Sequence, residues 1–191
     1  MTNDIAQTVE TITPVILKRA FARWQRAQEP PAELLRLKLL SGAASQSRTV
    51  KTIFLYDFIF DIVVDRLRSL RELAGIPHPD QLPVSRQALM ALLARDFAAG
   101  QQNPAPELAA WSALFHRFLL PVQVPPRALA EAAGISERHL RRHLALGLRY
   151  LAGVLRRFEW AACQQPGEHL LAHYLSAVGY RSPVGAERFL K

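Results

Sequence analysis

The segment from Pro125 to Leu155 constrains the fold most, because it has the pattern of two helices joined by a sharp turn. Proline suits the first turn of a helix, where its missing N–H costs nothing, and Pro125 and Pro126 stand at the expected start. Gly134 follows the first helix, and glycine adopts a positive φ without steric cost. Ser136 is a suitable N-cap for the second helix. The pattern predicts a helix-turn-helix.

The predicted second helix has an apolar face and a basic face. Leucines recur on it at steps of four and three, so we expect one buried side made of Leu140, Leu144, Leu148, Leu151 and Leu155. The other side would present Glu137, Arg138, Arg141, Arg142 and Arg149. Arginine makes bidentate contacts to guanine edges and to phosphates, and the second helix of such a motif enters the DNA major groove. These arginines therefore predict DNA binding; the alternative is an ordinary solvated helix face.

Charge is unevenly distributed along the chain, whose net charge is +8. Residues 1–124 contain 14 basic and 11 acidic side chains, whereas residues 125–191 contain 10 and 5. An anionic partner is therefore expected toward the C-terminus. The single cysteine, Cys163, excludes an internal disulfide and fits a cytoplasmic protein. The first residues lack the pattern of a signal peptide.

The rest of the chain is also predicted to be helical, which gives an all-α fold. The expected helices cover residues 13–29, 32–40, 47–74 and 85–97, and a further one runs from Pro104 or Pro106 to Leu120. Ser47 and Ser85 would cap two of these helices, and Gly75 and Gly100 would end them. The apolar side chains expected in the core include Val15, Ile16, Leu17, Phe21 and the tryptophans Trp24, Trp111 and Trp160.

We expect two domains. Residues 1–121 would form an N-terminal helical domain that dimerises or binds an effector or a protein partner. Residues 122–191 would form the helix-turn-helix domain, with a long extension helix and short C-terminal helices.

Residues 53–64 are apolar, but they are too few to cross a bilayer and include Asp57 and Asp61, so no membrane segment is expected. With Asp65, these carboxylates recur every four residues and form one stripe of a helix. We interpret the stripe as a solvated face or as partners for neighbouring arginines. A metal or acid–base site is the alternative.

Catalytic motifs are missing from the sequence, so we expect neither an enzyme nor a cofactor. His139 and His143 lie four residues apart, as do His169 and His173, and such pairs can bind zinc with help from Cys163. We favour surface or phosphate-contacting histidines and no metal site. The arginines are not interleaved with aromatic residues, which favours duplex over single-stranded DNA.

Residues 110–155 resemble the sigma-factor region-4-like helix-turn-helix, a module that also occurs in regulatory segments of large bacterial signalling ATPases. The resemblance rests on the aromatic/basic motif His116-Arg117-Phe118, an Ala-rich support helix, the sequence GISER and a basic helix with a leucine-spaced extension. It implies a bacterial helix-turn-helix regulator. The DNA-facing positions that it implies are Ser136, Glu137, Arg138, Arg141 and Arg142, and we add His139 and Arg149 from their place on the same helix.

Residues 178–191 resemble the second helix-turn-helix of arabinose-regulator (AraC) family activators through Gly179, Tyr180, Ser182, Arg188 and Lys191. Ala186 and Leu190 replace the usual aromatic residues, and the connecting segment is several residues too short.

Two function hypotheses follow. In the first, the chain is a transcriptional regulator that binds specific sequences of double-stranded DNA. In the second, it is a non-enzymatic adaptor in a signalling or defence assembly, and its helix-turn-helix binds protein.

Overall fold

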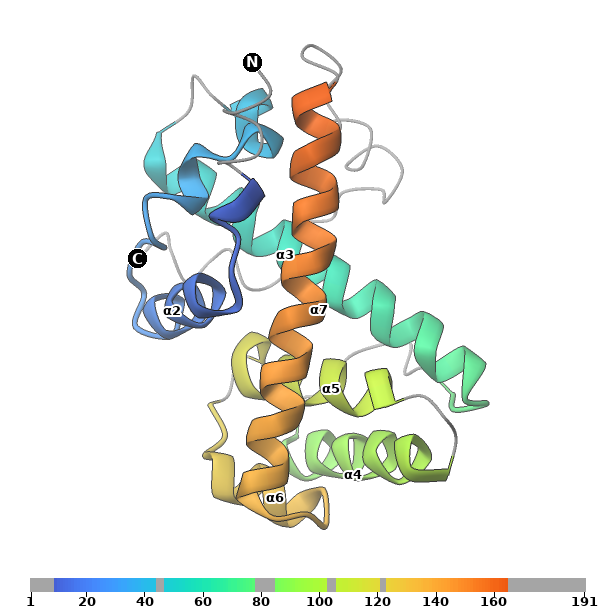
Figure 1. Cartoon of the computed structure of the whole chain (residues 1–191). Coiled ribbons are helices and arrows are strands. Elements are labelled where there is room, and N and C mark those ends of the chain that lie inside the picture. The colour runs from blue at the N-terminus through green and yellow to red at the C-terminus, as the bar shows by residue number, and fades with distance from the viewer. Residues whose placement is uncertain (1–8, 44–46, 78–84, 103–105, 121–122, 165–191) are drawn as a thin grey trace. The chain divides into compact units, whose positions relative to one another are not determined.

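The structure is a computed structural model that describes residues 9–43, 47–77, 85–102, 106–120 and 123–164 (Figure 1). Every regular element in these ranges is helical, which confirms the all-α fold. The α-helices are α2 (Pro14–Trp24), α3 (Arg48–Leu73), α4 (Arg86–Gln102), α5 (Pro106–Leu114), α6 (Pro126–Ala132) and α7 (Glu137–Gln164). Shorter turns are η1 (Leu34–Arg36), η2 (Lys38–Ala43) and the π-helical η3 (Phe115–Leu119).

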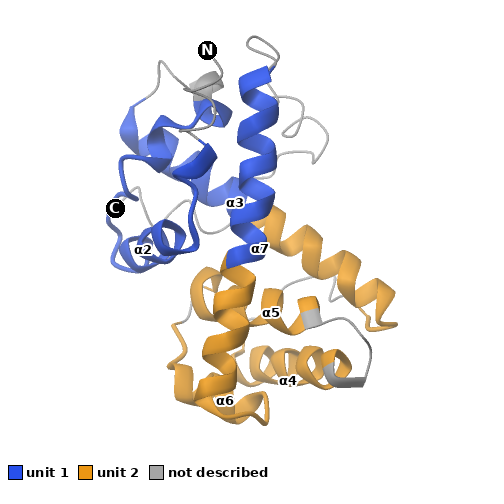
Figure 2. Ribbon diagram, in the orientation of Figure 1, with its two compact units in different colours: residues 1–59, 149–191 blue, residues 60–148 orange. Residues whose placement is uncertain are grey.

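The chain divides into two compact units (Figure 2). Unit 1 comprises residues 1–59 and 149–191, and unit 2 comprises residues 60–148. Helices α3 and α7 each contribute residues to both units. These two units are defined by contacts within the fold. The division into two functional domains near residue 121 stays a prediction.

Helix α2 forms much of the core of unit 1. Its buried face consists of Ile16, Leu17, Ala20, Phe21 and Trp24. Thr13 caps its start by accepting a hydrogen bond from the Ile16 N–H at 3.2 Å. The prediction that Val15 is buried is wrong, because 68% of this residue is exposed.

Helix α2 also ends at Trp24 instead of Glu29. The Gln28 N–H donates to the Arg23 carbonyl at 2.9 Å, and Ala27 between them has a φ of 54°. This left-handed conformation terminates the helix as a glycine usually does.

The helix expected over residues 32–40 is replaced by the tight turns η1 and η2. Glu159 of α7 is fully buried and accepts hydrogen bonds from the backbone N–H groups of Lys38, at 2.8 Å, and Leu39, at 2.9 Å. A carboxylate distant in sequence thus fixes the start of η2. The prediction that the neighbouring Trp160 is a core residue is wrong, because 56% of this residue is exposed.

Helix α3 begins and ends as the sequence predicts. The Val50 N–H donates to Ser47 Oγ at 3.3 Å, and Gly75 follows the helix with a φ of 67°. Helix α4 begins as predicted, since the Ala88 N–H donates to Ser85 Oγ at 3.1 Å. Gly100, however, does not end it, and α4 runs on to Gln102.

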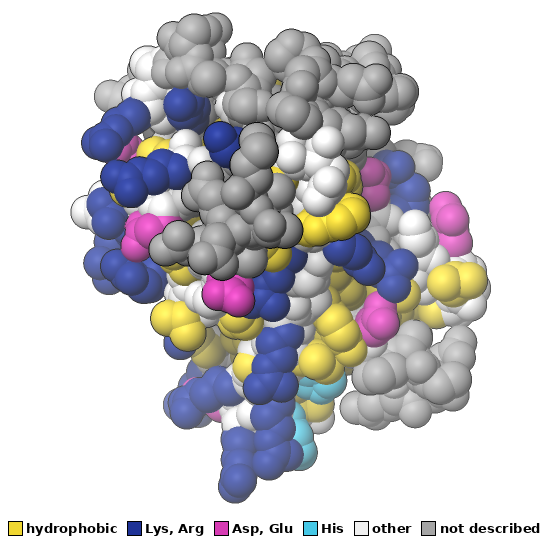
Figure 3. Space-filling view, turned by 45° about the horizontal axis from the view of Figure 1, so that its top comes forward, with side chains coloured by type: hydrophobic (Ala, Val, Ile, Leu, Met, Phe, Trp, Pro, Cys, Tyr) yellow, Lys and Arg dark blue, Asp and Glu magenta, His cyan; other side chains and the backbone are white. Residues whose placement is uncertain are grey.

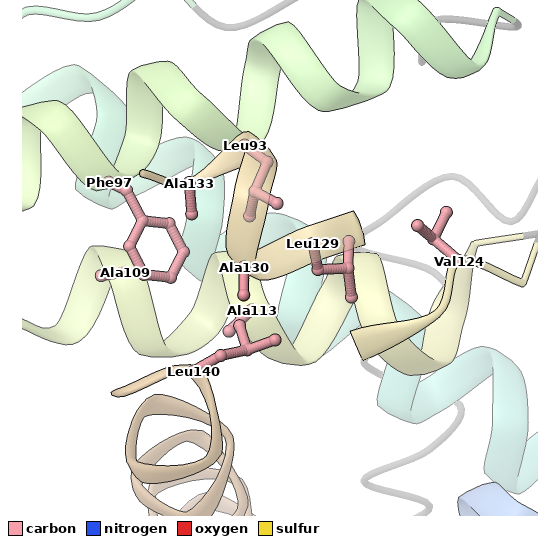
Figure 4. Close-up of a cluster of buried hydrophobic side chains, with 9 residues drawn as sticks. All are labelled: Leu93, Phe97, Ala109, Ala113, Val124, Leu129, Ala130, Ala133 and Leu140. Carbon is pink, nitrogen blue, oxygen red and sulfur yellow. The ribbon is translucent and has the colours of Figure 1, made fainter. Parts of the chain in front are cut away.

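One hydrophobic cluster in unit 2 brings α4, α5, α6 and α7 together (Figure 4). Its members are Leu93, Phe97, Ala109, Ala113, Val124, Leu129, Ala130, Ala133 and Leu140. The alanines allow the helices to approach closely, and Leu140 anchors the start of α7.

A buried polar network also links the helices of unit 2. Arg71 of α3 donates from Nε and Nη2 to the two carboxylate oxygens of Asp96, at 2.9 and 2.7 Å. Ser112 Oγ donates to Asp96 Oδ2 at 2.6 Å, and the ring of His116 lies beside Ser112. All four residues are at most 1% exposed.

His116 lies in η3, the π-helical turn that follows α5. Its Nδ1 lies 2.8 Å from the Ser112 carbonyl oxygen and its Nε2 lies 3.1 Å from that of Leu89. Burial lowers the pKa of the imidazole. The first residue of the His116-Arg117-Phe118 motif, on which the sigma-factor-like resemblance partly rests, is therefore buried in the core of unit 2.

The aspartates of α3 do not form one solvated face. Asp57 is 3% exposed, which contradicts that interpretation, because α3 is covered at this point by the core of unit 1. Burial, with a smaller effect from the charge of Asp65, raises the pKa of Asp61 to about 6. Asp65 lies nearer the surface and pairs with Arg68 at 3.4 Å.

Candidate nucleic-acid interface

The turn between α6 and α7 has the hydrogen bonds of a Schellman motif. The Ile135 N–H donates to the Ala130 carbonyl at 3.0 Å, and the Gly134 N–H donates to the Glu131 carbonyl at 3.1 Å. Gly134 has a φ of 64°, which confirms the prediction of a left-handed residue here. A Cβ atom at Gly134 would meet nothing within 4 Å, so any cost of substitution comes from backbone conformation and not from crowding.

The second helix begins at a side-chain cap, as predicted. The His139 N–H donates to Ser136 Oγ at 3.3 Å, and the Leu140 N–H donates to the Ser136 carbonyl at 3.0 Å. Glu137 occupies the first turn, where a negative charge interacts favourably with the helix dipole. Ser136 therefore has a structural role whether or not it contacts a ligand.

The leucine face of α7 points inward with one exception. Leu140, Leu148, Leu151 and Leu155 are buried, whereas Leu144 is only partly buried. The sequence did not predict a role for Gly147 in the packing of this helix. A Cβ atom there would lie 2.6 Å from the Ala110 carbonyl oxygen, so α7 and α5 pack more closely than any other residue would permit.

The opposite face of α7 is basic. Arg138, Arg141 and Arg142 are all exposed, and Arg149 is exposed two turns further along the helix. Figure 3 shows Lys and Arg side chains gathered at the lower end of the face drawn, where α6 and the start of α7 lie in Figure 1, with histidine beside them. The sequence thus placed these arginines correctly on the outer face.

The arginines differ in their interactions. Arg141 pairs with Glu137 at 3.2 Å, and Arg127 of α6 pairs with Glu131 at 2.9 Å. Within the described residues, the side chains of Arg138, Arg142 and Arg149 have no hydrogen-bond or ion-pair partner. Sequence reasoning overlooked Arg127, although its spacing of four residues from Glu131 is a helical ion-pair signal.

The two histidines of α7 have different environments. His139 is exposed and lies 3.3 Å from Ser136 Oγ. His143 is partly buried, with its ring edge against Phe97 at a centroid distance of 5.1 Å. Its buried Nδ1 has no hydrogen-bond partner among the described residues. Burial, with a smaller effect from His139, lowers the pKa of His143. His143 is therefore partly a core residue and not simply a surface histidine.

Neither a metal site nor a membrane-spanning helix is found among the described residues. Over the described ranges, no cluster of three or more His, Cys, Asp or Glu side chains is placed to hold a metal ion. A bilayer crossing would require a longer or more apolar helix than any that the described residues form. His169, His173 and the AraC-like residues 178–191 lie outside the described residues.

No protein-family model matches this chain, and the comparisons with curated proteins and with solved structures give no significant match. The candidate interface is therefore argued from its own residues and geometry.

Proposed function

We propose that the α6–α7 pair binds double-stranded DNA and that the protein is a cytoplasmic transcriptional regulator of the helix-turn-helix class. The observation that carries this proposal is the exposed basic face at the start of α7, where Arg138 and Arg142 have no partner among the described residues. Their guanidinium groups suit phosphate oxygens and guanine edges. Contacts from the N-terminal helices to a second copy or to another protein are part of the same proposal.

The tight turn and its hydrophobic cluster support this function because they hold α7 in a fixed direction. Gly134 and Ser136 define where the helix begins, and Leu140 anchors that end in the core. A recognition helix needs such rigidity, since base contacts depend on precise side-chain placement.

The test is a fluorescence-anisotropy titration of a short duplex of mixed sequence at several salt concentrations. Each neutralised phosphate contributes about −0.9 to the slope of log K against log salt, and we expect at least about three such contacts. Arg141→Ala and Arg142→Ala should weaken binding and leave the Tm nearly unchanged, because exposed charges contribute little to stability. Arg86→Ala, an exposed arginine on α4, is the control.

A flat salt response would contradict DNA binding and would favour the adaptor hypothesis. One observation supports the adaptor specifically: α7 continues to Gln164, well beyond the reach of a recognition helix, and carries the exposed Trp160. Exposed tryptophans are enriched at protein interfaces.

A further inference from the structure

Helix α2 in unit 1 has a second basic surface, which the near-balanced charge of the N-terminal part did not suggest. Its exposed side chains include Lys18, Arg19 and Arg23, and Arg26 follows in the turn after the helix. Lys and Arg side chains gather at the left of Figure 3, on the side where α2 lies in Figure 1. We call these four residues the α2 basic surface.

No carboxylate among the described residues pairs with the α2 basic surface. Residues 11–28 contain these four basic side chains and no acidic one. Within the described part of the chain, none of the four side chains has a hydrogen-bond or ion-pair partner. The next carboxylate along the chain, Glu29, lies 4.0 Å from Arg48 instead.

The chemistry of the rest of α2 restricts the kind of partner. Its apolar side chains, among them Leu17, Phe21 and Trp24, are already buried in the core of unit 1. Val15 is the exception, but one exposed valine does not form the continuous apolar face that an interfacial helix inserts into a lipid bilayer. Arg19 and Arg23 lie about one helical turn apart, at about 6 Å along α2, and Arg26 continues the row in the turn after the helix. Such a row suits a polymer with closely spaced negative charges.

We propose that the α2 basic surface binds the phosphate backbone of duplex DNA without reading its sequence. The identity of the polyanion rests on the proposed function of α6–α7, which brings duplex DNA to the same chain. Contacts to phosphates position a protein on DNA but carry no sequence information. A second contact within one chain also raises the overall affinity, because it is made at a high effective concentration.

The test compares pairs of substitutions that each remove two positive charges. Arg19→Gln with Arg23→Gln removes part of the α2 basic surface, and Arg138→Gln with Arg142→Gln removes part of the α7 face. Arg86→Gln with Arg157→Gln removes two exposed arginines elsewhere and is the control. Glutamine keeps a high helix propensity, so all three proteins should fold, which circular dichroism and Tm would verify.

Binding to a mixed-sequence duplex is measured by anisotropy over a range of salt. We expect the α2 pair to weaken binding by at least about tenfold and to reduce the salt slope by about 1.8, or 0.9 for each lost contact. The control pair should change neither quantity. The α7 pair should leave a weaker, salt-dependent binding, and adding the α2 pair to it should abolish that remainder.

The outcomes separate this inference from the function proposed for α6–α7. If the α2 pair binds with the parental affinity and slope, the inference is overturned, and the surface is only a solvated face. It is also overturned if the α2 pair loses binding to vesicles containing phosphatidylserine but keeps its DNA binding. If the α2 pair abolishes DNA binding and the α7 pair has no effect, the inference stands and the function proposed for α6–α7 fails.

Discussion

Unit 2 contains arginines in two opposite environments. Arg71 is 1% exposed and donates two hydrogen bonds to Asp96, which in turn accepts one from Ser112. Arg138 and Arg142 are exposed and have no partner among the described residues. An arginine side chain therefore stabilises the core in the first environment and is available to bind a ligand in the second.

This difference separates stability from binding. A buried guanidinium that lost its carboxylate would remain desolvated without compensation, so its partner matters greatly for folding. An exposed guanidinium is already hydrated, so its removal changes stability little. Substitutions in the two environments should therefore have nearly opposite consequences.

The largest effect is expected from Asp96→Ala. It should lower the free energy of unfolding by about 3–5 kcal/mol, because Arg71 would be left as an unpaired buried charge. Urea denaturation measures the loss. Asp65→Ala, which breaks the exposed pair with Arg68, is the control and should cost at most about 1 kcal/mol. A loss below that level for Asp96→Ala would mean that the interior network does not support the fold.

A second prediction concerns the buried face of α7. Leu140→Ala should cost about 2–5 kcal/mol, because Leu140 is fully buried in the cluster that joins α4 to α7. Leu144→Ala should cost less, since Leu144 is only partly buried. Thermal unfolding of the two variants ranks them. Equal losses would show that the two leucines are equally buried in solution.

A third prediction compares two glycines of α7. Gly147→Ala should destabilise by about 1–3 kcal/mol, because the new methyl group would collide with the Ala110 carbonyl. Gly153→Ala should instead stabilise by up to about 1 kcal/mol, since its Cβ would meet nothing within 4 Å and alanine favours the helix. Chemical denaturation of both variants tests the pair. A stabilising Gly147→Ala would contradict the close approach of α5 and α7.

The smallest effect is expected at Asp61. Burial raises the pKa of this carboxyl from 3.8 to about 6, so the folded state retains a proton that the unfolded chain has lost. Stability should therefore fall as the pH rises from about 4 to 6. Asp61→Asn should remove this dependence and, after allowance for solvent screening, stabilise the protein near pH 7 by about 1 kcal/mol. Urea denaturation across this pH range measures it, and an unchanged pH profile in Asp61→Asn would contradict the assignment.

The sequence predicted the features of the fold that depend on local rules. These features are the caps at Ser47, Ser85 and Ser136, the end of α3 at Gly75 and the left-handed Gly134, and each depends on only a few neighbouring residues. Helix periodicity also predicted the all-α class and the two faces of α7.

Features that depend on distant residues were missed. Glu159 fixes η2 although it lies 120 residues away in the sequence. Arg71 and Asp96 form a buried pair, but the sequence around them does not distinguish them from two exposed charged residues. Gly100 failed as a helix terminator because a glycine within a helix costs only about 1 kcal/mol, which packing can offset. Trp160 is exposed although tryptophan is usually a core residue, since its position on α7 faces away from the core of unit 1.

The sequence predicted which side chains of the candidate site are exposed, but it did not predict their ion pairs and ring contacts. Spacing placed Arg138, Arg141 and Arg142 on the outer face, but only the structure distinguishes Arg141, which pairs with Glu137, from the other two. The partial burial of His143 depends on Phe97 of α4, so its own helix gave no sign of it.

The most direct test of the DNA-binding face of α7 is an NMR titration of the ¹⁵N-labelled protein with a short duplex. Amide and arginine side-chain signals should shift over residues 136–149 and at Arg127, while those of the buried residues Arg71 and Ser112 should stay nearly unchanged. If the duplex shifts none of the signals of residues 136–149, α7 is not a DNA-binding helix and the proposed function is wrong.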